Sequence, residues 1–276
     1  MLEIPEVIAL SHQINERLVG REVTEVIANH SPHKFAWFYE DSDDYAHRLV
    51  GKVIDNAKPY GGLIEVSLGD IRIVFMDGVA LRLIMKGEKL PKKHQLLIKF
   101  DDDSTLIASV QMYGGMLCFK EGTYDNMYYQ VAKTKPSPLT EAFDKPYFSS
   151  LLDDPCVQKK SVKALLATEQ RIPGLGNGVL QDILFNAHIH PKQKVSSLTE
   201  EEIDTLFHAI KATLHEMTMH GGRDTEKDLF GCPGGYKTKL SKIAYKEPCR
   251  ACGGTIIKKA YMGGSIYYCE HCQPLD

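Results

Sequence analysis

The stretch that decides the fold reads Cys249-Arg-Ala-Cys252, then sixteen residues, then Cys269-Glu-His-Cys272. Two Cys-x-x-Cys pairs at this spacing are typical of a tetrahedral site with four thiolate ligands, because each pair forms a tight turn that directs two sulfurs at one point. Two disulfides, or four unrelated thiols, are the alternatives at this stage. The pattern predicts one structural Zn²⁺ ion.

The residues between the two pairs predict a β-hairpin. Thr255-Ile256-Ile257 and Ser265-Ile266-Tyr267-Tyr268 are rich in β-branched and aromatic residues, and Met262-Gly263-Gly264 lies between them. Such runs on either side of a glycine-containing turn are typical of a hairpin. Basic ribbons of this kind can lie against nucleic acid. The basic residues of this ribbon are Arg250, Lys258 and Lys259.

Length and composition are those of an ordinary globular protein, with 276 residues and a formal net charge of −3. This length predicts two or three structural units, each able to bury a core. The sequence has neither an apolar run of eighteen residues nor a signal peptide, so we expect a cytoplasmic protein without a membrane segment. The three remaining cysteines agree with a reducing compartment. They are Cys118, Cys156 and Cys232.

The charge is unevenly distributed along the chain. Residues 1–154 hold 17 basic and 23 acidic side chains, whereas residues 155–276 hold 16 and 13. A polyanion is therefore expected to meet the C-terminal half first. The asymmetry is small, and the alternative is that this charge distribution has no functional meaning.

The first half of the chain predicts one helix followed by a β-rich section. Pro5 suits the first turn of a helix, and the apolar positions that follow it recur at helical spacing up to Leu18 before Gly20 ends the pattern. Strand patterns follow at 23–28, 63–68, 71–75, 80–85, 95–100, 105–109 and 116–119. Strands at this spacing without intervening helices predict an antiparallel sandwich or barrel.

The second half changes to helical periodicity after a segment that contains Pro136 and Pro138. Helices are predicted at 157–170, 178–186 and 200–220, the last with an N-cap region around Thr199. The turn Pro173-Gly174-Leu175-Gly176-Asn177 joins the first two. Two glycines around one apolar residue allow backbone N–H groups to face outward, which at a helix N-terminus suits a phosphate. An ordinary helix–helix turn is the simpler alternative.

Three motifs in this order resemble the formamidopyrimidine-DNA glycosylase/endonuclease VIII family. They are the opening Met1-Leu2-Glu3-Ile4-Pro5-Glu6, the turn that ends at Asn177 with Asp182-Ile-Leu-Phe185 behind it, and the four-cysteine hairpin. The resemblance implies an α+β multidomain fold. Residues 1–132 would form a domain of the catalytic type, with an N-terminal helix and an antiparallel β-sandwich. Residues 133–145 would form a linker. A helix–two-turns–helix domain follows at 146–230, and a loop with the zinc-finger hairpin at 231–276.

The resemblance also implies a DNA repair glycosylase that flips a damaged base out of duplex DNA. In the family an N-terminal amine attacks the sugar, and strand cleavage by elimination (the AP-lyase step) follows. An α-amine suits this role because its pKa lies near 8. By position, Glu3 is the general acid/base and Glu6 supports the site; for Glu3 a solvated terminal charge is the alternative. The expected partner is double-stranded DNA with a damaged base or an abasic site, bound by a monomer in the bacterial cytoplasm or nucleoid.

Position 2 departs from the family, because Leu2 stands where the family has proline. A bulky second residue normally leaves the initiator methionine in place, so the free amine would belong to Met1, one residue further from Glu3. Three outcomes stay open. A primary amine still attacks, or Glu3 activates water and the strand is not cleaved, or the protein is a non-catalytic paralogue that binds damaged DNA.

Other family positions name the expected DNA contacts. Asn177 matches the family's turn asparagine, which holds a phosphate beside the lesion. The family's strand lysine falls at Tyr60, with Lys58 as the nearest basic candidate. Its arginine-arginine-aromatic wedge falls at Gln111-Met112-Tyr113, so Tyr113 is expected to fill the gap left by the flipped base, unless it is a core aromatic.

The ribbon arginine of the family falls at Gly264, and we expect Lys258 or Lys259 to take over its phosphate contact. Two phosphate contacts fewer would flatten the salt dependence of binding by about 0.9 each in slope. Further DNA contacts are expected at Lys163 and Tyr236.

Overall fold

The computed structural model describes residues 2–275 and divides the chain into two compact units. The N-terminal unit comprises Met1–Lys133 and Glu226–Pro233, and the C-terminal unit comprises Thr134–Thr225 and Gly234–Asp276. A segment that the sequence assigns to the C-terminal half therefore belongs to the N-terminal unit. Within the described residues, no helix is both long and apolar enough to cross a bilayer.

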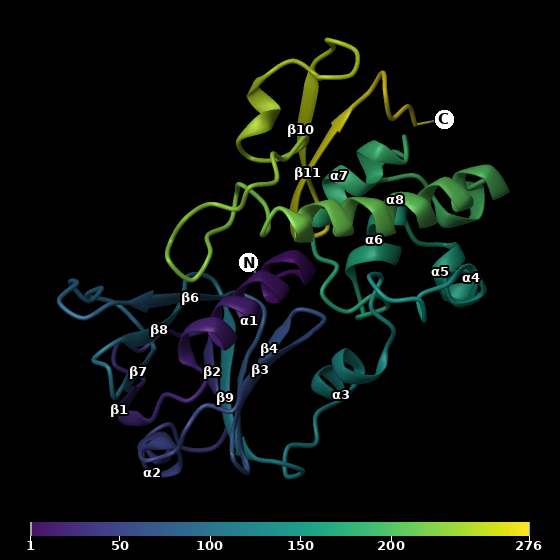
Figure 1. Ribbon diagram of the computed structural model, residues 1–276. Helices are drawn as coiled ribbons and strands as arrows, with labels where there is room; N and C mark the ends of the chain where they lie inside the picture. The colour runs from purple at the N-terminus through teal and green to yellow at the C-terminus, as the bar shows by residue number, and fades with distance from the viewer. Residues whose placement is uncertain (1, 276) are drawn as a thin grey trace. The chain divides into compact units, whose positions relative to one another are not determined.

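The N-terminal unit combines three helices with nine strands that form two sheets (Figure 1). The helices are α1 (Ile4–Leu18), α2 (Asp44–Leu49) and α3 (Met127–Thr134), the last of which ends at the unit boundary. The strands are β1 (Val23–Ala28), β2 (Ala36–Phe38), β3 (Asn56–Tyr60), β4 (Leu63–Leu68), β5 (Ile71–Phe75), β6 (Val79–Ile84), β7 (Leu96–Phe100), β8 (Thr105–Val110) and β9 (Gly114–Lys120).

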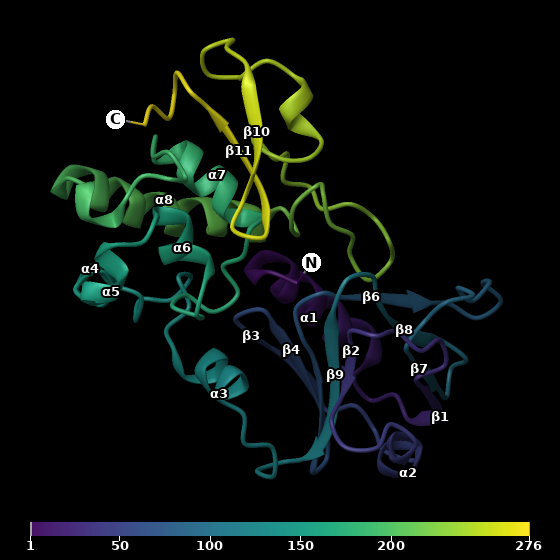
Figure 2. The same cartoon turned by 180° about the vertical axis from the view of Figure 1, so that it is seen from behind.

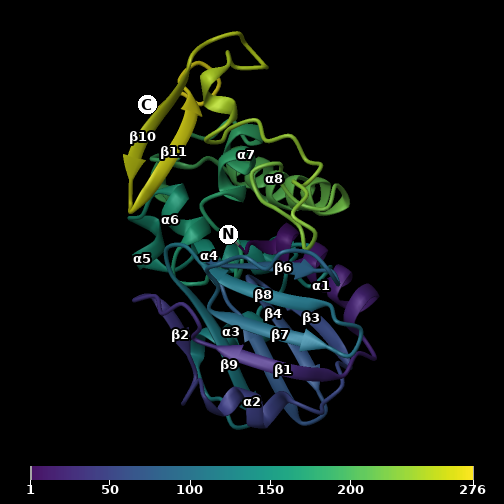
Figure 3. The ribbon, with the colours of Figure 1, turned by 90° about the vertical axis from the view of Figure 1, so that its left-hand side faces the viewer.

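The two sheets confirm the predicted sandwich. One has the order β1-β7-β8-β6 and the other the order β2-β9-β5-β4-β3, and Figure 3 shows the first of them from its outer side. Neighbouring strands are antiparallel except β2 and β9, which pair in parallel from Ala36 opposite Gly114 to Phe38 opposite Met116. Two open sheets thus form this unit, and the barrel alternative is wrong.

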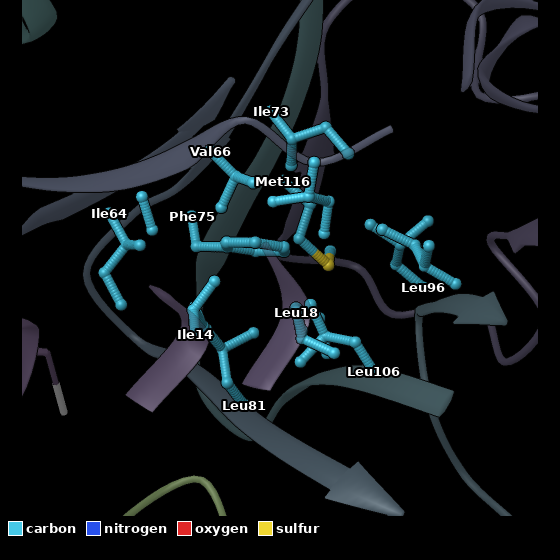
Figure 4. Close-up of a cluster of buried hydrophobic side chains, with 14 of the residues drawn as sticks. Ile14, Leu18, Ile64, Val66, Ile73, Phe75, Leu81, Leu96, Leu106 and Met116 are labelled. Carbon is cyan, nitrogen blue, oxygen red and sulfur yellow. The ribbon is translucent and has the colours of Figure 1, made fainter. Parts of the chain in front are cut away.

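Helix α1 is part of the sandwich core. Ile14 and Leu18, on its predicted apolar face, are fully buried, and Figure 4 shows them beside Phe75 and Leu106 from the two sheets. Asn15 also fixes the helix to β3, because its side chain donates to the Ala57 carbonyl at 2.8 Å and accepts from the Ala57 amide at 2.6 Å. Helix α1 is therefore held against the sandwich.

The segment Glu226–Pro233 is tied into the same unit by both apolar and polar contacts. Leu229 is fully buried in the sandwich core, and its carbonyl accepts from the Leu83 amide at 2.8 Å. Gln13 of α1 donates to Asp228 at 3.0 Å and accepts from the Leu229 amide at 2.9 Å. These contacts explain why a stretch far along the sequence belongs to the first unit.

The C-terminal unit is helical and ends in a two-stranded ribbon (Figure 2). Its helices are α4 (Lys145–Leu152), α5 (Pro155–Gln158), α6 (Val162–Ala167), α7 (Val179–Asn186), α8 (Glu200–Met219), and the 3₁₀ turns η1 (Val195–Ser197) and η2 (Ala244–Lys246); its strands are β10 (Ile256–Tyr261) and β11 (Gly264–Cys269). Thr199 and Glu202 form the capping box that opens α8, which confirms the predicted N-cap.

The predicted helix at 157–170 is wrong in its continuity. Helix α5 ends at Gln158, and Ser161 then caps α6 by accepting from the Ala164 amide at 3.3 Å. Serine is favoured at the start of a helix, because its side-chain oxygen satisfies an amide that has no partner within the helix. Glu169 and Gln170 have positive φ values and exclude a longer α6.

Candidate functional site

The four cysteines of the two Cys-x-x-Cys pairs form one cluster. Their Sγ atoms all lie within 4.8 Å of one another, with 3.8 Å between Cys249 and Cys272 and 3.5 Å between Cys252 and Cys269. All four are free thiols, so the disulfide alternative is wrong. A tetrahedral ion with bonds of about 2.3 Å to sulfur requires sulfurs about 3.8 Å apart. The donor set therefore fits a zinc-type metal centre.

The first pair sits on a turn that is built to hold a thiolate. Gly253 has a φ of 73° and donates its amide to the Cys249 carbonyl at 2.7 Å, and the Gly254 amide donates to Cys252 Sγ at 3.4 Å. That last bond lowers the pKa of the exposed Cys252 thiol to about 7, whereas burial raises the pKa of Cys269. The thiolate is the metal-binding form, so the amide that donates to Cys252 Sγ favours Cys252 as a metal ligand.

The hairpin predicted between the pairs is confirmed. Ile256 pairs with Cys269 and the register continues to Tyr261 opposite Gly264, so Met262 and Gly263 are the two turn residues. Their φ values are 50° and 73°, and two consecutive positive values are typical of the tight turn that matches the twist of a hairpin. The tip of the ribbon is therefore a rigid two-residue turn.

The ribbon tip meets the Asn177 turn within the C-terminal unit. Asn177 Nδ2 donates to the Ser265 carbonyl at 3.0 Å, and a Cβ atom on Gly264 would lie 3.3 Å from the same nitrogen. Gln181, buried in α7, strengthens the contact: its Nε2 donates to Ser265 at 3.3 Å and its Oε1 accepts from the Tyr267 amide at 3.0 Å. In Figures 1 and 2 the ribbon accordingly lies along α7.

Lys258 and Lys259 face opposite sides of the ribbon, because successive residues of a strand alternate. Lys259 is opposite Ile266 in the register, and Tyr261 on the same side is opposite Gly264, the residue that touches Asn177. Lys258 points the other way and lies over Tyr245 and Tyr267, at 5.3 and 5.9 Å from the ring centroids. Only Lys259 therefore shares a face with position 264.

Two further predicted DNA contacts are buried inside the C-terminal unit. Lys163 Nζ donates to the Tyr261 carbonyl at 2.6 Å, and burial lowers its pKa. Tyr236 packs near the carboxylate of Asp182, and burial raises the pKa of its phenol. Asp182 in turn accepts from the amides of Lys239 and Leu240 at 2.8 and 2.7 Å. Both predicted residues hold the ribbon and its leading segment against the helices; their contact with DNA stays a prediction.

The predicted catalytic residues begin α1 of the N-terminal unit. Glu3 is the N-cap residue of this helix and is 2% exposed, and Glu6 in its first turn is 5% exposed. The alternative that Glu3 is a solvated terminal charge is therefore wrong. Leu2 is also buried, with its side chain in the sandwich core. Met1 lies outside the described residues.

Tyr113 stands on the loop between β8 and β9, and more than a third of it is exposed, so the core-aromatic alternative is wrong. Its hydroxyl donates to Asp77 Oδ2 at 3.1 Å. Burial raises the pKa of Asp77, and it raises that of Tyr113 to about 12, so the phenol keeps its proton near neutral pH. A carboxylate therefore orients this tyrosine.

Comparison with known proteins identifies two domains of a single family. The sequence model of the formamidopyrimidine-DNA glycosylase N-terminal domain matches residues 1–107, and that of the formamidopyrimidine-DNA glycosylase H2TH domain matches residues 135–228. Together the two models match well over half of the chain. The chain belongs to the formamidopyrimidine-DNA glycosylase family.

Individual relatives match along their whole length. The formamidopyrimidine-DNA glycosylase of Bacillus cereus is 29% identical over 282 residues, with 99% of both chains covered. That of Listeria innocua is also 29% identical, over 99% of this chain and 100% of its own. The crystal structure of Lactococcus lactis Fpg with abasic-site DNA has a TM-score of 0.83 at 24% identity, over 99% of this chain and 100% of that one. At that identity the likeness shows the fold alone.

Several residues of this family member were not singled out by sequence reasoning. Trp37 lies against Tyr113 with ring centroids 6.1 Å apart, and Gln181 joins α7 to the ribbon.

Lys58, the predicted strand contact, is exposed on β3. Lys133 of α3 instead places its ammonium 4.8 Å from the Tyr60 ring centroid and 3.0 Å from the buried Glu65 carboxylate. A polar residue within an otherwise apolar helix is a sequence signal that could have identified Gln181. The contacts of Trp37 and Lys133 involve residues distant in sequence, so no local pattern reveals them.

Proposed function

We propose that this protein is a DNA glycosylase that flips a damaged base out of duplex DNA and removes it. The observation that carries this proposal is the contact between the Asn177 turn and the ribbon tip, in a chain of the formamidopyrimidine-DNA glycosylase family. Joined in this way, a phosphate-binding turn and a basic ribbon act on one stretch of DNA backbone. The loss of the ribbon arginine at Gly264 is offset in part by Lys259 on the same face.

In the proposed reaction Glu3 is the general acid/base. It is buried at the N-terminus of α1, where the helix dipole favours a carboxylate. The N-terminal amine forms a bond to the sugar anomeric carbon while the glycosidic bond breaks and the base leaves with its electron pair, and Glu3 transfers the protons. The resulting Schiff base permits strand cleavage by elimination. Without amine attack, Glu3 activates water and only the base is released.

A second function, non-catalytic recognition of damaged DNA, is favoured by one observation. Leu2 occupies the position of the family's nucleophilic proline, and its side chain is used for packing in the sandwich core. Without that proline, base release requires the amine of the mature N-terminus or a water molecule. If neither acts, the protein binds damaged DNA and does not cleave it.

Three measurements distinguish these routes: borohydride trapping on abasic-site DNA, base release from a duplex with a damaged base, and mass spectrometry of the mature N-terminus. An adduct on the N-terminal amine supports glycosylase action with strand cleavage. Base release without an adduct supports hydrolysis by water. Binding of damaged duplex with neither product would overturn the proposed enzyme in favour of the non-catalytic protein.

The variant Glu3→Gln is expected to lower the rate of base release by about 10²–10⁴-fold while binding is kept, because it removes proton transfer alone. Glu16→Gln, an exposed carboxylate on the same helix, is the matched control and is expected to keep full activity. Equal activity of the Glu3→Gln and Glu16→Gln proteins contradicts the role of Glu3.

We further propose that the four thiolates bind one structural Zn²⁺ ion, for which their number and spacing are suited. Bound there, the ion stabilises the ribbon and takes no part in the reaction. The proposed substrate is double-stranded DNA with a damaged base or an abasic site, bound by a monomer in the compartment that holds the chromosome. Elemental analysis of the purified protein and its sedimentation with and without DNA test these statements.

A further inference from the structure

Two aromatic side chains of the N-terminal unit lie next to each other and leave their faces open. Trp37 of β2 is 50% exposed and Tyr113 is 36% exposed, and their ring centroids are 6.1 Å apart with the planes tilted by 37°. The tilt is too large for parallel stacking, and a large part of each side chain remains open to solvent. Met112, 69% exposed, and Phe35, 47% exposed, are close by in the sequence on the same two segments. Single exposed apolar residues are ordinary, but a contiguous group marks a contact surface.

The two rings are held in place by backbone contacts on both sides. Strand β2 pairs in parallel with β9, with Trp37 opposite Gly115, and the Gly114 amide donates to the Phe35 carbonyl at 2.9 Å. Gly78 has a φ of 84°, and a Cβ atom there would lie 1.8 Å from the Tyr113 carbonyl oxygen. This glycine thus allows the Asp77 loop to pack directly under Tyr113. A ring that is already ordered loses little conformational entropy when it binds.

The position of the pair within its unit indicates what it binds. Tyr113 is within electrostatic reach of Glu3, the proposed catalytic carboxylate, and Trp37 lies beside Tyr113. Every nucleobase has a π-face, and stacking on aromatic side chains is the usual sequence-tolerant way to hold one. A flipped nucleotide leaves the faces of neighbouring bases uncovered at this point, and wedge residues cover such faces.

We propose that Trp37 extends the tyrosine wedge into a two-ring platform that stacks on the bases left exposed around the flipped nucleotide, including the base of the opposite strand. This inference rests on the proposed function and adds a second stacking residue to it. The platform favours DNA in which a base is missing or already extruded over intact duplex, because only the former presents uncovered base faces.

The chain contains a single tryptophan, so the intrinsic fluorescence of the wild-type protein reports on the platform directly. The full-length protein is titrated with two duplexes, one that carries a tetrahydrofuran abasic analogue and one that is intact, while binding is followed separately by anisotropy of labelled DNA. We expect Trp37 emission to be quenched at saturation with the abasic duplex and to change far less with the intact one. A 2-aminopurine opposite the analogue is expected to lose fluorescence on binding as it stacks.

Variants assign the effect to the ring. Trp37→Ala is expected to weaken binding of the abasic duplex by about tenfold, within the range for loss of one stacked base, and to change binding of the intact duplex by less. Trp37→Phe keeps a ring and is expected to retain most of the affinity. Met85→Ala removes another exposed apolar side chain of the N-terminal unit, 46% exposed directly after β6, and is expected to bind both duplexes like wild type.

The outcomes separate this inference from the proposed function. Saturable binding of abasic duplex with unchanged Trp37 emission overturns the platform and leaves the glycosylase intact. The absence of any DNA binding overturns both. A Trp37→Ala protein that sediments differently from wild type but binds DNA equally well also overturns the platform, and it assigns the surface to a second copy of the chain. The wild-type titration needs no variant, so it decides the question even where Trp37→Ala fails to fold.

Discussion

The sandwich of the N-terminal unit and the ribbon of the C-terminal unit are stabilised by different interactions. The sandwich buries large apolar side chains from two sheets and α1, as Figure 4 shows. The ribbon has two strands joined by a two-residue turn, and its buried cluster includes Cys249 and Cys269 themselves. A two-stranded hairpin by itself is marginal in water, so we expect the ribbon to depend on a bound metal ion and the sandwich to fold without one.

The same two regions differ in how closely they follow the family pattern. The C-terminal unit keeps the Asn177 turn and all four cysteines of the pattern and departs from it at Gly264, whereas the N-terminal unit departs from it at Leu2, Tyr60 and Gln111. The elements that join the turn to the ribbon are thus preserved, and the positions next to the proposed chemistry are altered. Recognition of DNA and bond cleavage can therefore be separated experimentally.

The largest expected effect is loss of one metal ligand. Cys269→Ala is expected to abolish metal binding and to unfold the ribbon, because structural zinc sites of small modules contribute about 10–16 kcal/mol. Metal stoichiometry and hydrogen exchange of residues 249–273 measure this, and the melting of the sandwich, followed by Trp37 fluorescence, is expected to be unchanged. Cys156→Ala, at an exposed free thiol, is the control. A ribbon that stays protected in the Cys269→Ala protein contradicts the metal-dependent fold.

A core truncation in the sandwich tests the other side of the comparison. Phe75→Ala is expected to lower the free energy of unfolding of the N-terminal unit by about 3–5 kcal/mol, because it removes a ring that is 1% exposed. Urea denaturation followed by Trp37 fluorescence measures the loss, while metal content stays at the wild-type value. The exposed Met85→Ala is expected to cost far less. Equal losses of unfolding free energy in the Phe75→Ala and Met85→Ala proteins would mean that the buried core does not stabilise the N-terminal unit.

Asp182 provides a pH-dependent test within the C-terminal unit. Burial raises its pKa from the ordinary 3.8 to about 6, so the folded state binds the proton more tightly than the unfolded state. Its contribution to stability is therefore full below about pH 4 and is lost as the pH rises through about 6. Asp182→Asn is expected to remove this dependence and to cost about 1–3 kcal/mol, because one of the Lys239 and Leu240 amides loses its acceptor.

Hydrogen exchange of those two amides between pH 4 and 7 measures the effect of Asp182→Asn. The exposed Asp153→Asn serves as the control, with the wild-type pH dependence expected. Identical pH profiles for wild type and Asp182→Asn would show that this carboxyl titrates normally in the folded protein.

The smallest effect distinguishes two neighbouring lysines. Lys259→Gln is expected to reduce the slope of log affinity against log salt by about 0.9, the loss of one phosphate contact, because Lys259 shares the face of position 264. Lys258→Gln removes the same charge from the opposite face and is expected to leave the slope unchanged. The affinity for DNA measured at several salt concentrations gives this slope for each variant. A larger change of slope for Lys258→Gln than for Lys259→Gln would show that Lys258, and not Lys259, faces the DNA.

Elements with a clear local pattern were predictable from the sequence, and elements that depend on distant partners were not. The strands at 63–68 and 71–75 have the predicted bounds, as does the start of α8, because their patterns repeat several times. Strand β2 has three residues and pairs with residues 114–116, so its stability comes from a partner that no local pattern reveals. The break at Ser161 was missed because apolar periodicity continued across it and outweighed the capping signal.

The sequence by itself determined the spacing of four thiols, the Asn177 turn and the hairpin, since each depends on residues close together in the chain. Only the tertiary structure decided that Trp37 lies against Tyr113, that residues 226–233 belong to the sandwich, and that Lys259 shares the face of position 264. The reason is physical: local geometry follows from backbone preferences and short loops. The partner of a distant side chain is instead selected by the packing of the whole unit, which no single stretch of sequence encodes.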